Sequence, residues 1–359
     1  MSKERVTVQD IADSLGLSRT TVSKVLNGAP NMPSHTISAV LNKAREMKYK
    51  QFSYIQAIQN IGKEDFPPKG GTFALLANFL PEHFHIASAI IASLEQEIST
   101  YGYSLTIHML KPGDIASLQL PPNFRPEQAD AILAIEIFSI EYSRMLASLG
   151  KPLLFFDSCY HPEAEPLDAN ILLMESRNNV FRMLSHVLSR ERIQHMGFIG
   201  DYKHCISFHE RYEGYKDALT LYNLPYEEQY CITQDDFLFQ KPDFLEVELK
   251  KMNKFPDMFC CANDLLAWKT ISALKSMNLE VPGDILICGF DDTAVLNAMD
   301  SPLTTVTTPS QEMGIMAAQI LLSRVNNPSL PPSTVYLNSK VQIRSSTDGN
   351  LRQVTAISG

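Results

Sequence analysis

The sequence predicts a multidomain protein with a small all-α head followed by a larger α/β core of two lobes, each built on a parallel sheet. Three observations predict this fold class. Apolar residues recur at helical spacing over residues 8–47, strand-like and helix-like runs alternate from residue 73 to residue 325, and a stretch rich in Pro and Gly separates the two regions. With 359 residues, 45% of them hydrophobic, the chain is long enough for about two to three domains.

The head begins with two short helices joined by a turn. Thr7 is placed to cap the first helix, with Asp10 three residues on as its capping-box partner. Gly16 has the backbone freedom to end that helix, and Ser18 is placed to cap the second. Two helices this short must share a core, and their inward residues are Val8, Ile11, Ala12, Leu15, Val22, Val25 and Leu26.

The outward face of the second helix carries Arg19, Thr20, Ser23 and Lys24, which make it polar and cationic with no acid. Such a face suits the major groove of DNA. A third helix predicted over residues 34–47 closes the unit, so the three helices form a helix-turn-helix head. The alternative interpretation is an ordinary small helical bundle.

Charge is divided unevenly along the chain. The formal charge of the whole protein is −9, yet residues 1–60 hold eight Lys/Arg against four Asp/Glu, and the remaining residues hold 23 against 36. The head is therefore at +4 and the body at −13. A basic head suits phosphate, while an acidic body either restricts DNA contact to the head or serves solubility.

Strand-like and helix-like segments alternate through the core, as in open parallel sheets. A first βα series starts at residue 73 and a second at residue 171. In such sheets ligands bind beyond the carboxyl ends of the strands, which makes Asn78 and Glu136 candidates in the first series. The predicted strands are 73–78, 104–109, 131–135, 152–156, 171–174, 196–199, 230–233, 258–261 and 285–290, with a short one after Pro302, and the helices are 86–101, 140–149, 178–189, 210–222, 244–252, 264–276 and 311–325.

Several classes of protein receive no support from the sequence. No N-terminal apolar run precedes the first helix and no uninterrupted apolar run of about 18 residues occurs, so we expect a soluble, cytoplasmic protein with no membrane association. The six cysteines lack the paired spacing of a zinc site and are expected to be reduced and buried. No nucleophile, zinc-protease or phosphate-loop motif occurs. We expect no metal, no cofactor and no enzymatic activity.

Two blocks of sequence resemble a known family. The segment VTVQDIADSLGLSRTTVSKVLN, residues 6–27, and the later block that contains ANDLLA, GFDD and PLTTV, residues 262–306, resemble the lactose-repressor-type (LacI/GalR) bacterial transcription regulators in order and spacing. Weaker matches occur at HMGFIG and ERYEGY. The resemblance runs from residue 6 to about residue 346, and it implies a DNA-binding head on a two-lobed periplasmic-binding-protein-like core.

The resemblance implies which head residues contact DNA. Arg19 and Thr20 fall where the family reads bases, with Ser23 and Lys24 on the same face. Lys24 stands where the family usually has Arg, so a compact ammonium group replaces a planar guanidinium that could bind two acceptors side by side. The family positions that contact phosphates or orient the head correspond here to Thr7, Ser18, Thr21, Asn27 and Tyr49. The alternative role for each of these residues is helix capping or packing.

The linker after Tyr49 departs from the family pattern. Family hinges often read YxPNxxAxxL, whereas here Gln51, Phe52 and Ile55 stand for Pro, Asn and the small Ala. Ile58 falls at the minor-groove leucine, which implies a wedge that opens a central base step of the operator. The alternative is a segment that is disordered off DNA or packs on the core.

For the core, the resemblance implies a site for a small effector, a sugar or sugar derivative. Carboxylates, an amide and a guanidinium hydrogen-bond hydroxyl groups, and an aromatic ring covers an apolar sugar face. Asn263 and Asp291 keep an alternative interpretation as a helix cap and a turn residue. The predicted effector-binding residues are Asp157, Arg211, Phe237, Asn263 and Asp291.

The sequence thus predicts a homodimeric transcriptional regulator, in most family members a repressor, that binds a pseudo-palindromic double-stranded DNA operator under effector control. Three other functions remain as alternatives: a solute-binding module, an α/β enzyme, and a regulator that senses a protein partner. The predicted divisions are a helix-turn-helix domain at 1–52, a hinge at 53–71, a first lobe at 72–165 and 302–327, and a second lobe at 166–301 and 328–346.

Overall fold

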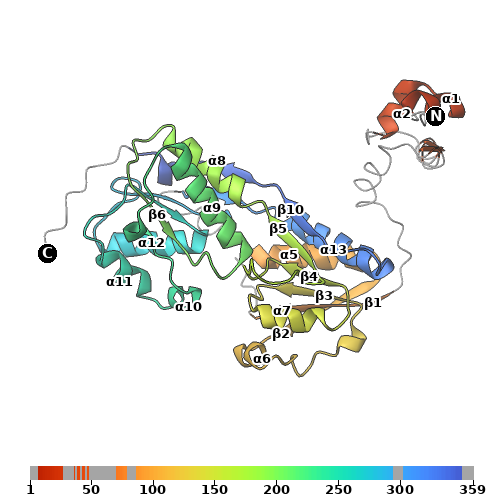
Figure 1. The fold of residues 1–359 in the computed structure, drawn as a ribbon, viewed down its shortest axis with the longest axis horizontal. Helices are drawn as coiled ribbons and strands as arrows, with labels where there is room; N and C mark the ends of the chain where they lie inside the picture. Colours follow the sequence, from red (N-terminus) through yellow and green to blue (C-terminus); the bar gives the residue numbers. More distant parts are fainter. Residues whose placement is uncertain are drawn as a thin grey trace. The chain divides into compact units, whose positions relative to one another are not determined.

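A computed structural model describes residues 7–26, 36, 39–40, 43–44, 47, 70–78, 86–293 and 302–349. The chain divides into two compact units, Met1–Pro67 and Pro68–Gly359, which we describe separately (Figure 1). Residues 53–69 of the predicted hinge, with Ile58, lie outside the described residues, as do Asn27 and Tyr49, whereas its last residue, Gly71, belongs to the first strand of the core.

The first unit contains the two helices that the sequence predicts, α1 (Val8–Leu15) and α2 (Arg19–Leu26). The capping box at the start of α1 is confirmed, since the Thr7 N–H donates to Asp10 Oδ2 at 2.7 Å and the Asp10 N–H donates to Thr7 Oγ1 at 3.3 Å. Gly16 ends α1 in the left-handed conformation (φ 62°). The core of the unit consists of Ile11, Ala12, Val22, Val25, Leu26, Val40 and Ala44, with Val8, Leu15, Leu17 and Met47 packed against them.

The first lobe of the second unit is built on a six-stranded parallel sheet in the order β10-β5-β4-β3-β1-β2. Successive side chains of a strand point to opposite faces, and both faces of this sheet are apolar because helices cover both. Its strands are β1 (Gly71–Ala77), β2 (Tyr103–Met109), β3 (Ala131–Ile135), β4 (Leu153–Phe156), β5 (Asn170–Met174) and β10 (Thr334–Leu337).

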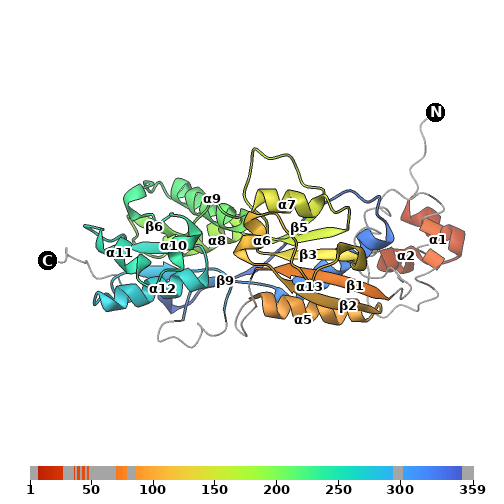
Figure 2. The same cartoon turned by 90° about the horizontal axis from the view of Figure 1, so that it is seen from below.

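Helices lie on both sides of this sheet, as Figure 2 shows. On one side α7 (Ile140–Ala147) buries Tyr142 and Leu146 in a cluster with alternate residues of the central strands. On the other side α5 (Ile86–Ser99) packs along α13 (Ser310–Asn326), although the two helices lie more than 200 residues apart in the sequence. The remaining short helices of this lobe are α6 (Pro112–Ala116) and the 3-10 turn η1 (Pro126–Gln128).

The second lobe is built on the parallel strands β6, β7 and β8, with the antiparallel pair β9 and β11 beside them. Helix α8 packs against α9, and α12 packs on β7 and β8. The elements are α8 (Arg177–Leu188), β6 (Met196–Ile199), α9 (Ile206–Leu221), η2 (Glu228–Tyr230), α10 (Asp236–Phe239), α11 (Phe244–Lys250), β7 (Met258–Cys261), α12 (Asp264–Ser276), β8 (Leu286–Cys288), β9 (Thr305–Thr307), β11 (Lys340–Gln342) and η4 (Ser345–Thr347).

The predicted lobe boundaries are wrong at three strands. Residues 166–301 and 328–346 were expected in the second lobe, but β5 pairs with β4 and β10 pairs with β5, so both strands belong to the first sheet. Conversely, β9 lies in the predicted first-lobe segment 302–327 but pairs with β11. An apolar run in the sequence predicts a strand but not the strand with which it pairs, because strand pairing joins residues that lie far apart in the sequence.

Some predicted elements also differ. Residues 230–233 form no strand, and only a single bridge joins Ile232 to Ile199 of β6. Helix α9 begins at Ile206, four residues before the predicted start, so it includes Ser207. Strand β8 is shorter than predicted, and α10, β10 and β11 were not predicted.

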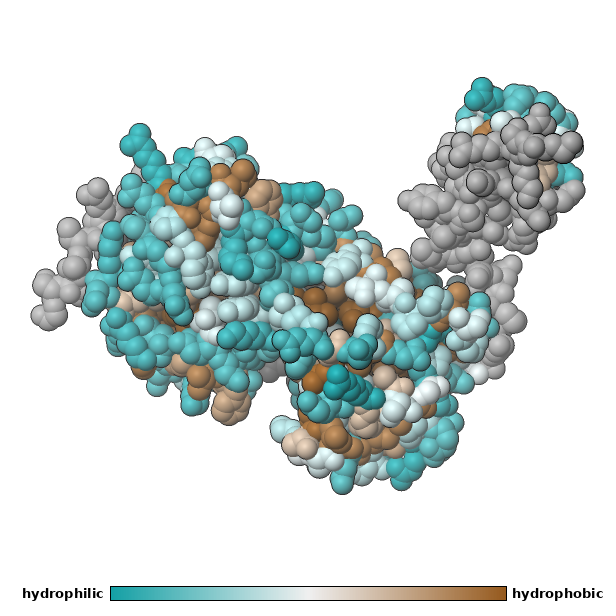
Figure 3. Space-filling model, viewed as in Figure 1, coloured by the Kyte–Doolittle hydropathy of each residue, from teal (hydrophilic) through white to brown (hydrophobic). Residues whose placement is uncertain are grey.

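The face of the core seen in Figure 3 is largely hydrophilic, and its apolar residues form separate small patches. Among the described residues, no helix combines the length and apolarity that a bilayer crossing requires. Five of the six cysteines are buried thiols, and Cys231 is partly exposed.

Candidate functional site

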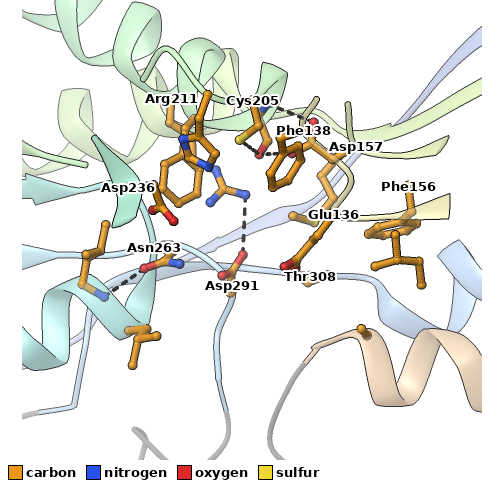
Figure 4. A pocket seen from close by; sticks show the side chains of 18 of the residues that line it. Glu136, Phe138, Phe156, Asp157, Cys205, Arg211, Asp236, Asn263, Asp291 and Thr308 are labelled. Atoms are coloured by element: carbon orange, nitrogen blue, oxygen red, sulfur yellow. Dashed lines mark hydrogen bonds and ion pairs between the residues drawn. The ribbon is translucent and has the colours of Figure 1, made fainter. Parts of the chain in front are cut away.

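A cavity of about 310 Å³ lies between the two lobes of the second unit (Figure 4). It is lined from the first lobe by residues that end β3, β4 and β5, and from the second lobe by the starts of α9 and α12 and by the segment after β8. This is the position that parallel-sheet lobes give to a ligand, beyond the carboxyl ends of their strands. Of the predicted effector residues, Asp157, Arg211, Asn263 and Asp291 line it.

Arg211 occupies the centre of the second-lobe wall. Its Nη1 donates to the Ala262 carbonyl at 2.7 Å, its Nη2 lies 3.5 Å from Asp291 Oδ1, and its guanidinium stacks 3.8 Å from the centre of the Phe290 ring. Arg211 is 4% exposed, and its Nε is buried without a partner among the described residues. A fixed cation with one unsatisfied N–H provides a donor for a hydroxyl oxygen.

Asp291 is the acid that pairs with Arg211. Burial raises its pKa to about 7, an effect that Asp264 strengthens and the Arg211 charge opposes. Its backbone φ of 119° lies in a region that side-chain-bearing residues rarely adopt, and such strain clusters at ligand sites. The ion pair and the strain favour a ligand role for Asp291 over an ordinary turn.

Asp157 joins the two lobes directly. It follows β4, and its Oδ2 accepts a hydrogen bond from Ser207 Oγ at 2.5 Å while its Oδ1 accepts one from the Ser207 N–H at 3.3 Å. Ser207 lies in the first turn of α9, where free N–H groups and the helix dipole favour a carboxylate. A first-lobe carboxylate therefore caps a second-lobe helix at the edge of the cavity.

Asn263 caps the start of α12, which is the alternative to ligand binding that the sequence analysis had left open. Its Oδ1 accepts from the Leu266 N–H at 2.9 Å at the start of α12. This bond occupies the oxygen and leaves the amide NH₂, which Figure 4 shows on the side toward Asp291, as the group that can donate to a ligand. The two roles are compatible because they use different atoms.

Glu136 lies at the end of β3, where strand-end reasoning made it a candidate. Burial raises its pKa to about 8, and Asp157, Asp291 and Asp236 add to the increase. Its backbone, like that of Asp157, is left-handed, with φ values of 51° and 59°. Asn78 follows β1 and is exposed, but it does not line the cavity.

The prediction for Phe237 is wrong. Phe237 lies in the single turn of α10 with 65% of its surface exposed, and it does not line the cavity. Phe239, two residues on, is 3% exposed and lines it. The two side chains point in different directions because they are separated by about 200° around a helix.

Several lining residues had no signal in the sequence analysis. Ser207 was placed before the predicted helix, Thr308 belongs to a loop without a motif, and Asp236 begins α10, a helix that was not predicted. The Thr308 hydroxyl is buried without a partner among the described residues, and Thr308 is 9% exposed. Only strand-end reasoning, applied to every crossing between lobes, would have found such positions.

The residues predicted to face DNA belong to the separate first unit. Arg19, Thr20 and Lys24 of α2 are exposed, and Ser23 and Thr21 are partly exposed. Ser18 Oγ accepts from the Thr21 N–H at 3.0 Å, and Thr7 takes part in the capping box, so both hydroxyls have a helix-capping role. The exposed face of α2 carries the cations and no acid.

The fold and cavity define a class of protein, one with a two-lobed ligand-binding core. Residues 186–347 match the periplasmic binding protein-like domain family, which confirms the expected architecture of the core. The cellobiose complex of the transcriptional regulator CelR shares the fold, with a TM-score of 0.67 at 20% identity over 95% of this chain and 100% of that chain. The lac repressor dimer bound to operator and the anti-inducer ONPF has a TM-score of 0.62 at 19% identity, over 96% and 99%.

The more particular identification follows from a curated relative. The chain is 27% identical to the HTH-type transcriptional regulator GalR of Streptococcus thermophilus over 349 residues, 95% of this chain and 99% of that protein. The homologues of this protein are LacI/GalR-type transcriptional regulators, and the resemblance inferred from the sequence is confirmed.

Proposed function

We propose that this protein is a dimeric transcriptional repressor whose affinity for a pseudo-palindromic DNA operator is set by a small hydroxylated effector bound between its lobes. One observation carries the proposal. A chain whose relatives are transcriptional regulators holds a cavity of about 310 Å³ in which Arg211, Asp291, Asp157 and Asn263 converge from segments far apart in the sequence. Fixed donors and acceptors around an enclosed volume favour a sugar or a sugar derivative.

At the output end, Arg19 and Thr20 contact base edges of the major groove, with Ser23 and Lys24 beside them. A bidentate contact from Arg19 to guanine discriminates by about 1–3 kcal/mol. Ile58 enters the minor groove as a wedge from each of two symmetric hinges. The residues that contact phosphates and set the register of the head are Thr7, Ser18, Thr21, Asn27 and Tyr49.

At the input end, effector binding favours one arrangement of the lobes. Asp157 and Ser207 bridge the lobes at the cavity edge, so a ligand that competes for Asp157 or adds to its contacts changes the preferred lobe angle. The DNA affinity then shifts only by the difference in effector affinity between the two arrangements. Each head of a dimer binds one half of the operator.

The test is fluorescence anisotropy of the full chain on DNA from the upstream region of its own gene, with and without candidate sugars. Arg19→Ala should weaken binding to that DNA about tenfold or more. The control is Arg190→Ala, which removes an exposed arginine of the second unit and should leave the affinity for that DNA unchanged. Lys24→Gln should lower the slope of log affinity against log salt by about one. No sequence-specific binding under any condition refutes the proposed function.

We propose further that the cavity binds its ligand without converting it. Each of its best-placed acids is held by a structural contact: Asp291 pairs with Arg211, and Asp157 accepts from Ser207 and from the Ser158 N–H. Turnover of a bound sugar that Asp291→Ala abolishes, in a variant that folds normally, would refute this part of the proposal.

A further inference from the structure

The cavity between the lobes is acidic. Its described lining includes the four carboxyl groups of Glu136, Asp157, Asp236 and Asp291, two side chains with permanent positive charge, Arg211 and Lys269, and one imidazole, His204. Acids come from the ends of β3 and β4, from α10 and from the segment after β8, so the excess is shared by both lobes. Carboxyl groups thus outnumber the fixed cations around a ligand in this cavity.

The two cations already have protein partners. Arg211 donates to the Ala262 carbonyl and pairs with Asp291, and Lys269 Nζ donates to the Phe239 carbonyl at 2.7 Å. His204 Nδ1 lies 2.5 Å from the Asp201 carbonyl oxygen. A carboxylate or phosphate on the ligand would therefore have to displace an existing contact while lying near several acids.

Glu136 is the acid of this cavity whose pKa is raised furthest, first of all by burial. The charged groups that raise its pKa, after burial, are Asp157, Asp291 and Asp236, all of them acids, and the resulting value is about 8. At neutral pH Glu136 therefore retains its proton in the ligand-free protein. A positive group beside it would favour the carboxylate and release that proton.

Two further groups point to a ligand independently of the acids. Thr308 Oγ1 and Arg211 Nε are both buried, both belong to residues that line the cavity, and neither has a hydrogen-bond partner among the described residues. An unsatisfied buried polar group costs about 1–3 kcal/mol, which a hydroxylated ligand would recover. In Figure 4 Thr308 lies beside Glu136 and Arg211 lies across the cavity above Asp291.

We propose that the effector is a hydroxylated compound with a protonated amine, an amino sugar being the simplest kind, whose ammonium group lies against Glu136 while its hydroxyls reach Arg211 and Thr308. This inference rests on the proposed function and narrows its effector to one chemical class. It excludes sugar acids and sugar phosphates as effectors.

The test is isothermal titration calorimetry of the full chain at pH 6.5 with two matched sets of sugars: D-glucosamine, D-glucose and D-glucuronate, and D-galactosamine, D-galactose and D-galacturonate. We expect at least one amine to bind about tenfold more tightly than its neutral partner, a difference of about 1.4 kcal/mol, and no binding of the acids. Titrations in buffers of different ionisation enthalpy should show about one proton released per amine bound, because the cation lowers the pKa of Glu136.

Glu136→Gln should abolish both the preference for the amine and the proton release. The matched control is Glu246→Gln, a surface substitution on α11 that should change neither quantity. The proposal is overturned if neither amine binds, if a neutral or acidic sugar binds as tightly as its amine, or if Glu136→Gln keeps the preference.

Operator anisotropy in the same samples separates this inference from the proposed function. If a neutral or acidic sugar changes the operator affinity and the amino sugars do not, the proposed function as an effector-controlled regulator stands. The proposal that its effector carries an amine is then refuted. If the chain binds no operator sequence specifically, the proposed function itself fails, whichever sugar binds.

Discussion

The two lobes contribute different chemistry to the one cavity that they share. From the first lobe come two carboxyl groups, Glu136 and Asp157, on left-handed backbone at the ends of neighbouring strands. From the second lobe come the cation Arg211 and the amide of Asn263, together with Asp291. The first lobe thus supplies carboxyl groups and the second supplies the fixed cation and the amide, so neither lobe alone holds the full set of contacts for a hydroxylated ligand.

This division has a mechanical consequence. A ligand that needs both sets of groups binds most tightly when the lobes are held at one angle, and this differential affinity is the free energy available to change the state of another part of the chain. If one lobe alone accounted for binding, the ligand would leave the lobe angle unchanged. Four experiments test the division.

The largest effect is expected at the second-lobe cation. Arg211→Ala leaves Asp291 buried without its charge partner and should lower the free energy of unfolding of the core by about 3 kcal/mol, measured by urea denaturation, with loss of effector binding. Arg177→Ala is the matched control, because Arg177 pairs with Asp217 at the surface, where an ion pair contributes at most about 1 kcal/mol. Equal effects of the two substitutions would contradict the role of Arg211.

The second experiment tests which phenylalanine of the second lobe supports the cavity. Phe239→Ala removes a buried ring that packs edge-to-face on Phe244 and should cost about 3 kcal/mol of unfolding free energy. Phe237→Ala, two residues away on the exposed side of α10, should change the stability by less than about 0.5 kcal/mol and leave effector binding intact. A larger effect of Phe237→Ala than of Phe239→Ala would support the prediction from the sequence that Phe237 contacts the effector.

The third experiment concerns the first-lobe acid and uses pH. The folded protein raises the pKa of Glu136 to about 8, so between its ordinary value of 4.5 and about 8 the folded state binds a proton that the unfolded state has lost. The contribution of Glu136 to stability is therefore fully present below pH 4.5 and is lost as the pH rises to about 8, at up to about 1.4 kcal/mol per pH unit.

Urea denaturation of the ligand-free protein at several values between pH 5.5 and pH 8 measures this slope. Glu136→Gln should flatten it, and Glu246→Gln should not. Asp291, with its pKa raised to about 7, contributes a slope of the same sign over a lower pH range. A stability that rises with pH in this range, with no change of slope in Glu136→Gln, would mean that burial and the neighbouring acids do not raise the pKa of Glu136.

The smallest effect is expected where the lobes touch. The bond between Asp157 and Ser207 should give a coupling energy of about 1.5 kcal/mol in a double-mutant cycle of Asp157→Asn and Ser207→Ala, measured as unfolding free energy. Ser272→Ala is the control, since its hydroxyl donates to the Trp268 carbonyl within the same helix. A coupling near zero would show that the lobes do not depend on this contact.

Much of the fold follows from local patterns. The predicted bounds of β3, β6, β7 and α12 agree with the structure residue for residue, because each is an apolar run of the right period between clear start and stop signals. The capping box of Thr7 and Asp10 is likewise a local contact three residues apart. Resemblance to a family then pointed to four of the residues that line the cavity.

The sequence by itself therefore determined the kinds of elements, the charged outer face of α2 and the resemblance to LacI/GalR-type regulators. Tertiary structure alone decided that β5 and β10 complete the first sheet, that Phe239 and not Phe237 faces the cavity, and that Asp157 caps α9 across the lobes. It also brought together four acids spread over more than 150 residues of chain, from Glu136 to Asp291. The reason is physical: periodicity and capping act within a few residues, whereas strand pairing, burial and the field at a carboxyl group depend on neighbours that only folding brings close.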